Sequence, residues 1–302
     1  QEINALNSYA SPTPAIEAGR VYVSFGAHGT ACLDTATGRV LWTRRDFQCD
    51  HYRGPGSSPI LVDDLLLLHF DGFDLQYVVA LDKTTGKTVW KTDRSTKFGD
   101  IDGDFRKAFC TPIVIGSGPQ RQLVSPGSKA AMAYDLHTGR ELWKIHFDGF
   151  SSTARPLAAD GLVFLFTGFG KSALWAVRPD GQGDVTESHV VWKYSRSVPC
   201  KPSAVLVDGL IFMATDTGRA VCLEAATGRE LWQKRLGGDY SASPIVAEGR
   251  VYFFSHDGKT TVIEANRAGK VLAQNRLDDG FMASPAVSGK SLILRTKKRL
   301  LC

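Results

Sequence analysis

Short apolar or alternating runs follow one another along most of the chain. Examples are RVYVSF (20–25), LVFLFT (162–167), LIFMAT (210–215) and RVYFFS (250–255). Runs of this length and period are typical of β-strands, and no segment shows the 3.6-residue period of an amphipathic helix. Turn sequences such as EAGR, VDG and AEGR separate the runs. The pattern therefore predicts an all-β fold of short strands.

The runs belong to a repeat. Near-copies of one phrase occur as LDTATGRVLW (33–42), LDKTTGKTVW (81–90), YDLHTGRELW (134–143) and LEAATGRELW (223–232). Each unit begins with a proline, which follows Ser or Thr in most units, and these prolines lie 41 to 53 residues apart: Pro14, Pro59, Pro112, Pro156, Pro202, Pro244 and Pro285. Four short strands in about 40–50 residues are typical of a propeller blade. We predict a β-propeller of seven four-stranded blades.

The repeated phrase has a mechanical interpretation. Its glycine supplies a positive φ for the turn between the third and fourth strands, and the neighbouring Thr and Asp can bond the turn backbone. Its tryptophan falls on the outer, fourth strand, where an indole can pack between adjacent blades at about 4–6 kcal/mol before folding entropy is counted. The predicted blade-docking residues are Trp42, Trp90, Trp143, Trp192 and Trp232.

The ends of the repeat predict how the propeller closes. The last unit stops at Cys302 after its third strand, and QEINAL (1–6) aligns with the fourth-strand sequence LWQKRL (231–236). We expect residues 1–6 to complete the last blade, which makes residues 1–302 a single propeller domain. An eighth blade upstream of the given chain is the alternative.

Composition and charge narrow the function. The 302 residues carry a net charge of +5 without a basic arm, which disfavours nucleic-acid binding. No apolar run reaches the roughly 18–20 residues that a membrane span needs. The six cysteines are too few for a disulfide scaffold: Cys32, Cys222 and Cys302 share a repeat position with Ala and Val and are expected to be buried, whereas a disulfide among Cys49, Cys110 and Cys200 stays open.

The motif Leu-Asp-x-x-Thr-Gly-Arg/Lys-x-x-Trp resembles the repeats of pyrroloquinoline-quinone-type propellers. That superfamily includes quinoprotein alcohol dehydrogenases and the lipoprotein factor that assists outer-membrane protein assembly. The whole chain is most similar to uncharacterised propeller-repeat proteins of planctomycete-like bacteria. The resemblance implies a bacterial, exported protein, either periplasmic or secreted.

The same resemblance bears on cofactors. Quinoprotein dehydrogenases have two adjacent cysteines over the quinone and hold calcium through Glu, Asn and Asp. This chain has no Cys-Cys pair and no matching ligand set. We therefore expect no cofactor and disfavour pyrroloquinoline quinone.

Functional residues are expected where the repeats differ. The loops that lead into each blade and those between second and third strands share one rim, and their sequences vary from blade to blade. Since first strands line the axis of a propeller, basic residues of these loops would converge on a central mouth. The predicted ligand-binding residues of this mouth are His51, Tyr52, Arg53, Asp71, Arg106, Lys107, Arg155, Lys171, Lys201, Tyr240 and Phe281.

Two interpretations of the mouth stay open. The cations can attract an anionic ligand or an acidic protein surface. They can instead be paired with carboxylates in a water-filled funnel, with Asp71, Asp100, Asp239 and Asp279 as the expected partners.

The segment GDIDGD also has two interpretations. Its alternating Asp100, Asp102 and Asp104 resemble the start of a structural calcium loop, but position twelve is Thr111 instead of glutamate. The alternative is a solvated acidic turn. No histidine pair has a metal-ligand spacing.

These observations favour a non-catalytic, monomeric binding or scaffold propeller that contacts a protein partner or an anionic ligand. The alternative is an enzyme, or a carbohydrate- or anion-binding protein, that uses His51, Arg53, Asp71, Arg106 and Arg155 in the mouth. A true quinoprotein dehydrogenase is the third and least favoured interpretation.

Overall fold

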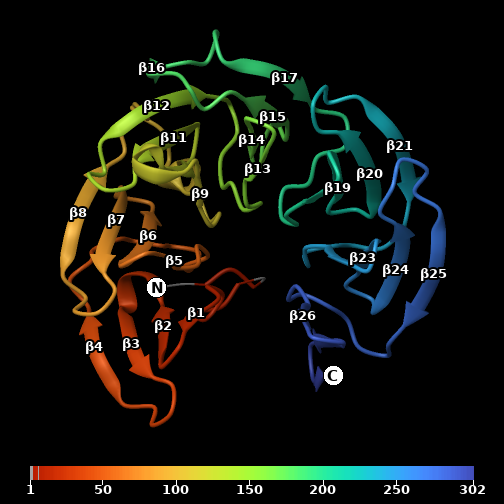
Figure 1. Cartoon of the computed structure of the whole chain (residues 1–302), viewed down its shortest axis with the longest axis horizontal. Coiled ribbons are helices and arrows are strands. Elements are labelled where there is room, and N and C mark those ends of the chain that lie inside the picture. The colour runs from red at the N-terminus through yellow and green to blue at the C-terminus, as the bar shows by residue number, and fades with distance from the viewer. Residues whose placement is uncertain (1–2, 6) are drawn as a thin grey trace. The chain divides into compact units, whose positions relative to one another are not determined.

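The computed structural model describes residues 3–5 and 7–302. In this part of the chain, seven β-sheets, antiparallel apart from one short parallel pair, account for nearly all regular structure (Figure 1). The helical elements described are three short 3-10 turns, η1 (Gly26–His28), η2 (Gly103–Arg106) and η3 (Gly118–Gln120). The prediction of an all-β propeller built from blades is confirmed.

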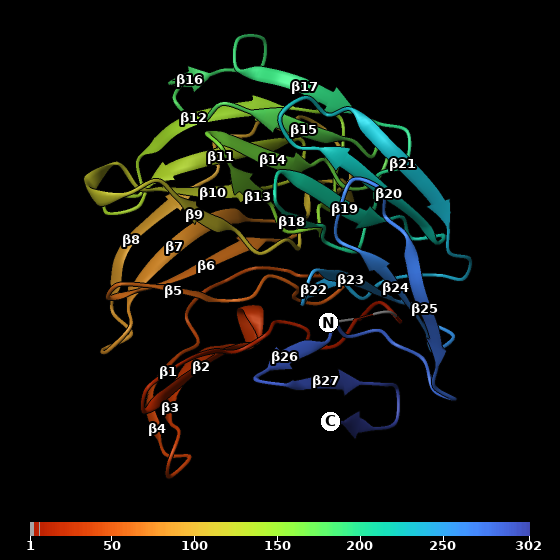
Figure 2. The ribbon, with the colours of Figure 1, turned by 45° about the vertical axis from the view of Figure 1, so that its right-hand side comes forward.

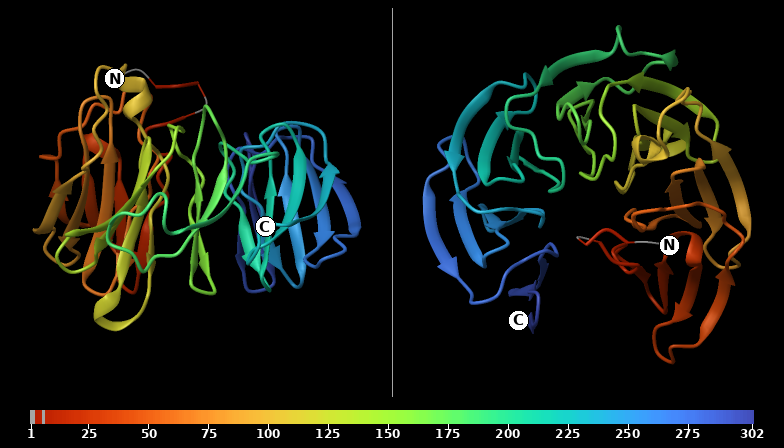
Figure 3. Two further views of the ribbon diagram at one scale, coloured as in Figure 1. Left: turned by 90° about the horizontal axis from the view of Figure 1, so that it is seen from above. Right: turned by 180° about the vertical axis from the view of Figure 1, so that it is seen from behind.

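The chain divides into two compact units, and unit 1 consists of the described residues up to Thr153 together with Pro179–His189. It contains the first three blades, whose sheets lie side by side in red, orange and yellow-green (Figure 3). Their strands are β1 (Ala15–Glu17), β2 (Arg20–Ser24), β3 (Thr30–Asp34) and β4 (Val40–Arg44); β5 (Ile60–Val62), β6 (Leu65–Asp71), β7 (Gln76–Asp82) and β8 (Thr88–Asp93); β9 (Ile113–Ile115), β10 (Gln122–Pro126), β11 (Ala130–Asp135) and β12 (Glu141–His146).

Unit 2 consists of Ala154–Arg178 and Val190–Cys302 and contains blades four to seven (Figure 2). Its strands are β13 (Leu157–Ala159), β14 (Leu162–Phe166), β15 (Leu174–Val177) and β17 (Val190–Tyr194); β18 (Val205–Val207), β19 (Leu210–Ala214), β20 (Arg219–Glu224) and β21 (Glu230–Arg235); β22 (Ile245–Ala247), β23 (Arg250–Phe254), β24 (Lys259–Glu264) and β25 (Val271–Arg276); β26 (Ala286–Ser288), β27 (Ser291–Arg295) and β28 (Leu300–Leu301).

Two blades depart from the regular four-strand pattern. The short strand β16 (Gly183–Asp184) leaves the fourth blade's sequence and pairs in parallel with β12, so the third sheet has five strands. The last sheet has three described strands. The sequence predicted that residues 1–6 supply its fourth strand. Residues 3–5 form no strand, and the N–H of Asn4 donates to the carbonyl of Arg53 at 3.4 Å, so the predicted strand is not seen in this part. Residues 1, 2 and 6 lie outside the described residues.

The register explains why one repeat position is always small. In the first six blades the third strand shifts register against its partner after that position, for example between Cys32 and Leu33. In the first five of these blades the small residue lies directly opposite the tryptophan, as Cys32 does with Trp42 and Cys222 with Trp232. Both thiols are fully buried, as the sequence predicted, whereas Cys302 is exposed and its predicted burial is wrong.

The repeated tryptophans contact the next blade. The indole N–H of Trp42 donates to the carbonyl of Lys83 at 3.0 Å, and a Cβ on the turn glycine Gly86 would lie 2.7 Å from the Trp42 ring. Gly86 has a φ of +71°, so both the turn and the close approach require glycine. Trp90 and Trp192 make the same bond to the carbonyls of the following blades.

Two tryptophans differ from this pattern. Trp143 donates instead to Gln122 Oε1 at 2.8 Å. Gln122 in turn donates to the carbonyl of Pro179, at the start of the segment Pro179–His189 that carries β16. The indole N–H of Trp232 is buried and has no hydrogen-bond partner in the described residues.

The hydrophobic core lies between neighbouring blades of each unit. Blades one and two share a cluster with Leu66, Phe70 and Tyr77, and blades five and six share one with Phe212 and Phe253. Because the second blade packs against both the first and the third blade, the loops at its strand ends are held on a packed core. All six cysteines are free, so the disulfide considered among Cys49, Cys110 and Cys200 is not formed.

Candidate functional site

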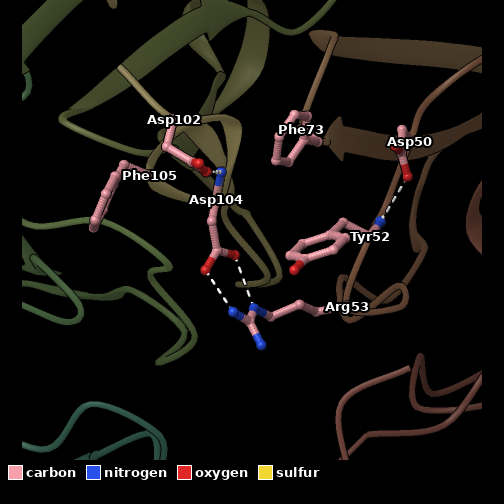
Figure 4. Close-up of a pocket in the computed structure, with 7 residues that line it drawn as sticks. All are labelled: Asp50, Tyr52, Arg53, Phe73, Asp102, Asp104 and Phe105. Carbon is pink, nitrogen blue, oxygen red and sulfur yellow. Dashed lines mark hydrogen bonds and ion pairs between the residues drawn. The ribbon is translucent and has the colours of Figure 1, made fainter. Parts of the chain in front are cut away.

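A pocket of about 480 Å³ lies among three loops of unit 1 (Figure 4). The loops are residues 45–59, which lead into the second blade, residues 72–75 between β6 and β7, and residues 94–112, which lead into the third blade. These are the loop classes in which the sequence predicted functional residues. The lining residues are Asp50, Tyr52, Arg53, Phe73, Asp102, Asp104 and Phe105.

Hydrogen bonds join the first two loops. The Asp74 carboxylate accepts from the backbone N–H of Asp50 at 2.7 Å, and the N–H of Phe73 donates to the carbonyl of Asp50 at 2.7 Å. The Asp50 carboxylate accepts from the N–H of Tyr52 at 2.9 Å, which holds Tyr52 at a φ of +52°. A Cβ at Gly72 would lie 2.5 Å from Cys49 Sγ, so glycine lets these loops meet.

The third loop presents its residues from the short helix η2. Asp102 caps this helix by accepting from the N–H of Asp104 at 2.8 Å. Gly103 passes so close to Phe73 that a Cβ would lie 2.4 Å from the ring. Arg106 folds back onto its own loop and donates to the carbonyl of Ile101 at 2.7 Å, so it does not line the pocket.

An ion pair between Arg53 and Asp104 joins the loops across the pocket. Arg53 donates through Nε and a terminal nitrogen to the two Asp104 oxygens, at 2.8 and 2.7 Å (Figure 4). The guanidinium also lies 5.1 Å from the centre of the Tyr52 ring. Arg53 holds the pKa of Asp104 below its usual range, so this carboxylate is charged at neutral pH.

Lys107 lies behind the pocket wall. Its side chain is fully buried, and in the described residues its ammonium has no hydrogen-bond partner. It lies 4.4 Å from the ring centre of Phe109 and 5.7 Å from that of Tyr52, so aromatic faces are its nearest favourable contacts. Burial lowers the pKa of Lys107 to about 8.

The predicted acid–base candidates His51 and Asp71 are both buried. His51 Nε2 accepts from the N–H of Ala27 at 3.1 Å, and burial lowers the pKa of His51 to about 4, so the ring is neutral at pH 7. Asp71 is paired with Arg94 through bonds of 2.5 and 2.7 Å. Neither residue lines this pocket.

Sequence reasoning missed the polar cluster around Asp71. Arg94 also donates to the Ser125 hydroxyl at 2.8 Å, and His69 Nδ1 lies 3.1 Å from the same oxygen. The order Ser, His, Asp looks like a nucleophile site, but Arg94 occupies both Asp71 oxygens and all four side chains are buried. No local signal links residues so far apart in sequence; their meeting depends on the pairing of blades two and three.

The remaining candidates belong to unit 2. Arg155 is exposed, and its backbone N–H donates to Ser203 Oγ. Lys201 lies 3.5 Å from Asp216 Oδ1, and Lys171 is exposed on the β14–β15 loop.

Tyr240 and Phe281 are fully buried in unit 2, which explains why aromatic residues recur at their repeat position. The Phe281 ring packs edge-on against Phe254, with ring centres 5.3 Å apart. The sequence predicted that four cations converge on a central mouth: Arg53, Arg106, Arg155 and Lys201. They belong to both units, so their convergence stays a prediction. The carboxylates that pair with Arg53 and Lys201 are Asp104 and Asp216, neither of which the sequence suggested as a partner.

Two of the three aspartates of GDIDGD bind other groups of the protein, whereas Asp100 is exposed. Asp102 caps η2 and Asp104 pairs with Arg53. Among the residues that the structure describes, no three His, Cys, Asp or Glu side chains are grouped to hold a metal ion. In the same part of the chain, no helix has the length and apolar character to cross a membrane.

The sequence of the chain matches a known protein family. The sequence model described as outer membrane protein assembly factor BamB matches residues 3–114 and 74–302. The BamB of Yersinia pestis is 25% identical over 213 residues, covering 65% of this chain and 51% of that protein. A tetrathionate hydrolase of Acidithiobacillus ferrooxidans is 22% identical over 259 residues, covering 80% and 48%. The chain thus spans about half the length of these curated relatives.

Solved structures agree on the fold. BamB from Moraxella catarrhalis superimposes with a TM-score of 0.70 at 14% identity, covering 94% of this chain and 82% of that one. The quinohemoprotein alcohol dehydrogenase from Comamonas testosteroni gives 0.67 at 13% identity, covering 95% and 61%. Likeness at this identity establishes the propeller fold alone, since one fold supports many functions.

Proposed function

The chain belongs to the family described as outer membrane protein assembly factor BamB, and from that premise we propose that it is a non-catalytic propeller that binds another protein. The proposed docking surface is the pocket of unit 1 and the loops around it. By the same family membership we propose an exported, periplasmic location.

The main observation behind this proposal is that aromatic rings are exposed on loops joined to one another by hydrogen bonds and an ion pair. Tyr52 is 37% exposed and Phe105 is 43% exposed, and both line the pocket. The Phe105 ring is supported by Phe150 at 4.8 Å, and Tyr52 by Phe73 at 5.5 Å. Rigid aromatic side chains are enriched at protein interfaces, because they bury a large area at low entropic cost.

The pocket offers little for catalysis. His51 and Asp71 are buried and bound elsewhere, and the buried Lys107 is not in the lining. A catalytic pocket would present a titrating group to its substrate. The pocket also does not fit pyrroloquinoline quinone, because that tricarboxylate would meet three aspartates and a single arginine.

Site-specific photocrosslinking tests the proposal. Benzoylphenylalanine replaces Phe105 in one variant and Thr37 in a matched control, since Thr37 is exposed on the β3–β4 turn at the other end of the first sheet. We expect one discrete protein adduct at position 105 and none at position 37. The adduct should disappear when purified wild-type chain competes, and should persist when the competitor is the Phe105→Glu variant.

Two results contradict the proposal. One is the absence of a protein adduct at position 105. The other is an adduct of equal yield at position 37, which would indicate non-specific contact.

A further inference from the structure

The pocket lining carries a net negative charge, whereas the whole chain carries a net positive charge. The chain carries a net charge of +5, yet the lining contains Asp50, Asp102 and Asp104 against one arginine, Arg53. Including Lys107 behind the wall still leaves the site acidic by one charge. A cation is therefore favoured here, in contrast to the anionic ligand that the sequence predicted.

The aromatic residues of the lining favour the same kind of ligand. The rings of Tyr52, Phe73 and Phe105 line the cavity beside the carboxylates (Figure 4). Aromatic faces attract ammonium and guanidinium groups, and the attraction grows where water is partly excluded. Aromatic rings combined with carboxylates are the chemistry that recognises a lysine or arginine side chain.

Arg53 is an example of a guanidinium group bound in this pocket. This cation belongs to the chain itself, yet it is bound by both kinds of group at once, with Tyr52 at 5.1 Å and the two Asp104 oxygens at 2.8 and 2.7 Å. Asp50 and Asp102 each bind a backbone N–H through one oxygen. A carboxylate has lone pairs for several donors, so both can accept from an incoming cation as well.

The cavity is large enough for a side chain together with flanking backbone. Its volume of about 480 Å³ lies within the range of about 300–1,000 Å³ that is usual for ligand sites. The walls are already in place, because the loops are cross-linked by Arg53–Asp104 and by the backbone bond between Phe73 and Asp50. Binding therefore costs little reorganisation.

We propose that the unit 1 pocket binds a lysine or arginine side chain of an extended, basic segment of the partner protein. The cation lies against the aromatic rings, and Asp50 and Asp102 accept its N–H groups. This inference rests on the proposed function, since it names the chemistry of the segment that the docking surface recognises.

Binding of defined peptides tests the assignment. Short Gly/Ser peptides with one central arginine, lysine or glutamate carry a neutral fluorophore, and anisotropy is measured against the full chain at low salt. We expect the arginine and lysine peptides to bind and the glutamate peptide to fail. Raising NaCl from about 50 to about 500 mM should weaken binding of the arginine peptide several-fold in the unmutated chain, because screening shortens the reach of the carboxylates.

Isosteric variants identify the groups involved. The double substitution Asp50→Asn and Asp102→Asn keeps the oxygens that accept from the Tyr52 and Asp104 N–H groups but removes two charges, and it should weaken arginine-peptide binding about tenfold. The matched control Asp93→Asn, on a carboxylate whose side chain is 84% exposed outside the pocket, should leave the affinity unchanged. Tyr52→Leu should weaken it about three- to fivefold.

Tighter binding of the glutamate peptide overturns the inference, as does equal affinity of the double variant and the Asp93→Asn control for the arginine peptide. Its failure is distinguishable from failure of the proposed function. A protein adduct at position 105 without arginine-peptide binding leaves the scaffold role intact and removes the cation preference. Arginine-peptide binding without any adduct removes the scaffold role.

Discussion

Replacing Arg94 by methionine should destabilise unit 1 more than any substitution that breaks an ion pair on the surface. The Arg94 side chain is 1% exposed and that of Asp71 is fully buried. Arg94 donates to Asp71 at 2.5 and 2.7 Å, and to the carbonyl and hydroxyl of Ser125 at 3.0 and 2.8 Å. The guanidinium thus joins β6 of the second blade to β10 of the third.

The magnitude follows from what the substitution leaves behind. Methionine fills similar volume and is apolar, but Asp71 then keeps a buried charge without a counter-ion, next to His69 at 3.7 Å. Removing one partner of a buried ion pair costs about 3–5 kcal/mol. The double variant Arg94→Met with Asp71→Asn removes both charges, so it should recover about half of that loss.

Urea unfolding followed by tryptophan fluorescence and by far-ultraviolet circular dichroism measures the change. The matched control is Asp63→Asn, which breaks the exposed pair between Asp63 and Arg121 and should cost much less stability than Arg94→Met. A loss for Arg94→Met no larger than for Asp63→Asn would refute the reasoning. So would a double variant that is less stable than Arg94→Met alone.

Three further predictions test the blade contacts and the buried histidine. Trp90→Phe should cost about 1 kcal/mol more than Trp232→Phe in urea unfolding, because only the Trp90 indole N–H has a hydrogen bond to lose. Gly86→Ala should cost about 2–4 kcal/mol and Gly38→Ala about 1 kcal/mol, since both have a φ of +71° but only Gly86 abuts a tryptophan ring; equal losses would mean that this contact contributes nothing. The folded pKa of His51 is about 4 against 6.5 unfolded, so the unfolded chain binds more protons between these values and stability falls, by up to about 3 kcal/mol, as pH drops from 6.5 to 4. His51→Gln should flatten this slope in urea titrations at several pH values, and an unchanged slope would assign it to other groups.

The fold was predictable because five of the seven repeats carry their own docking tryptophan. A glycine that turns the backbone and a tryptophan ten residues into the phrase recur at fixed spacing, and their contact with the next blade needs no long-range information. The exception is informative: Cys302 shares the repeat position of Cys32 but has no fourth-strand tryptophan opposite it in the described residues, so it is exposed.

The site was predictable only in part. Loop variation located Tyr52 and Arg53, and the resemblance of GDIDGD to a calcium loop singled out Asp102 and Asp104. Neither signal showed that Arg53 would pair with a carboxylate 51 residues away. The cations of the loops suggested an anionic ligand, but the sequence did not show that three aspartates line the pocket beside Arg53. Tyr240 and Phe281 resembled ligand-binding aromatics in sequence but pack into the core between blades, which only the register of the strands decides.

The most direct test of the central claim uses the protein that crosslinks at position 105. Its dissociation constant is measured by titration calorimetry with the wild-type chain, the Asp50→Asn/Asp102→Asn variant and the Asp93→Asn control. We predict binding that is about tenfold weaker for the double variant and unchanged for the control. The same dissociation constant for all three chains would contradict the claim that this acidic, aromatic pocket docks the partner.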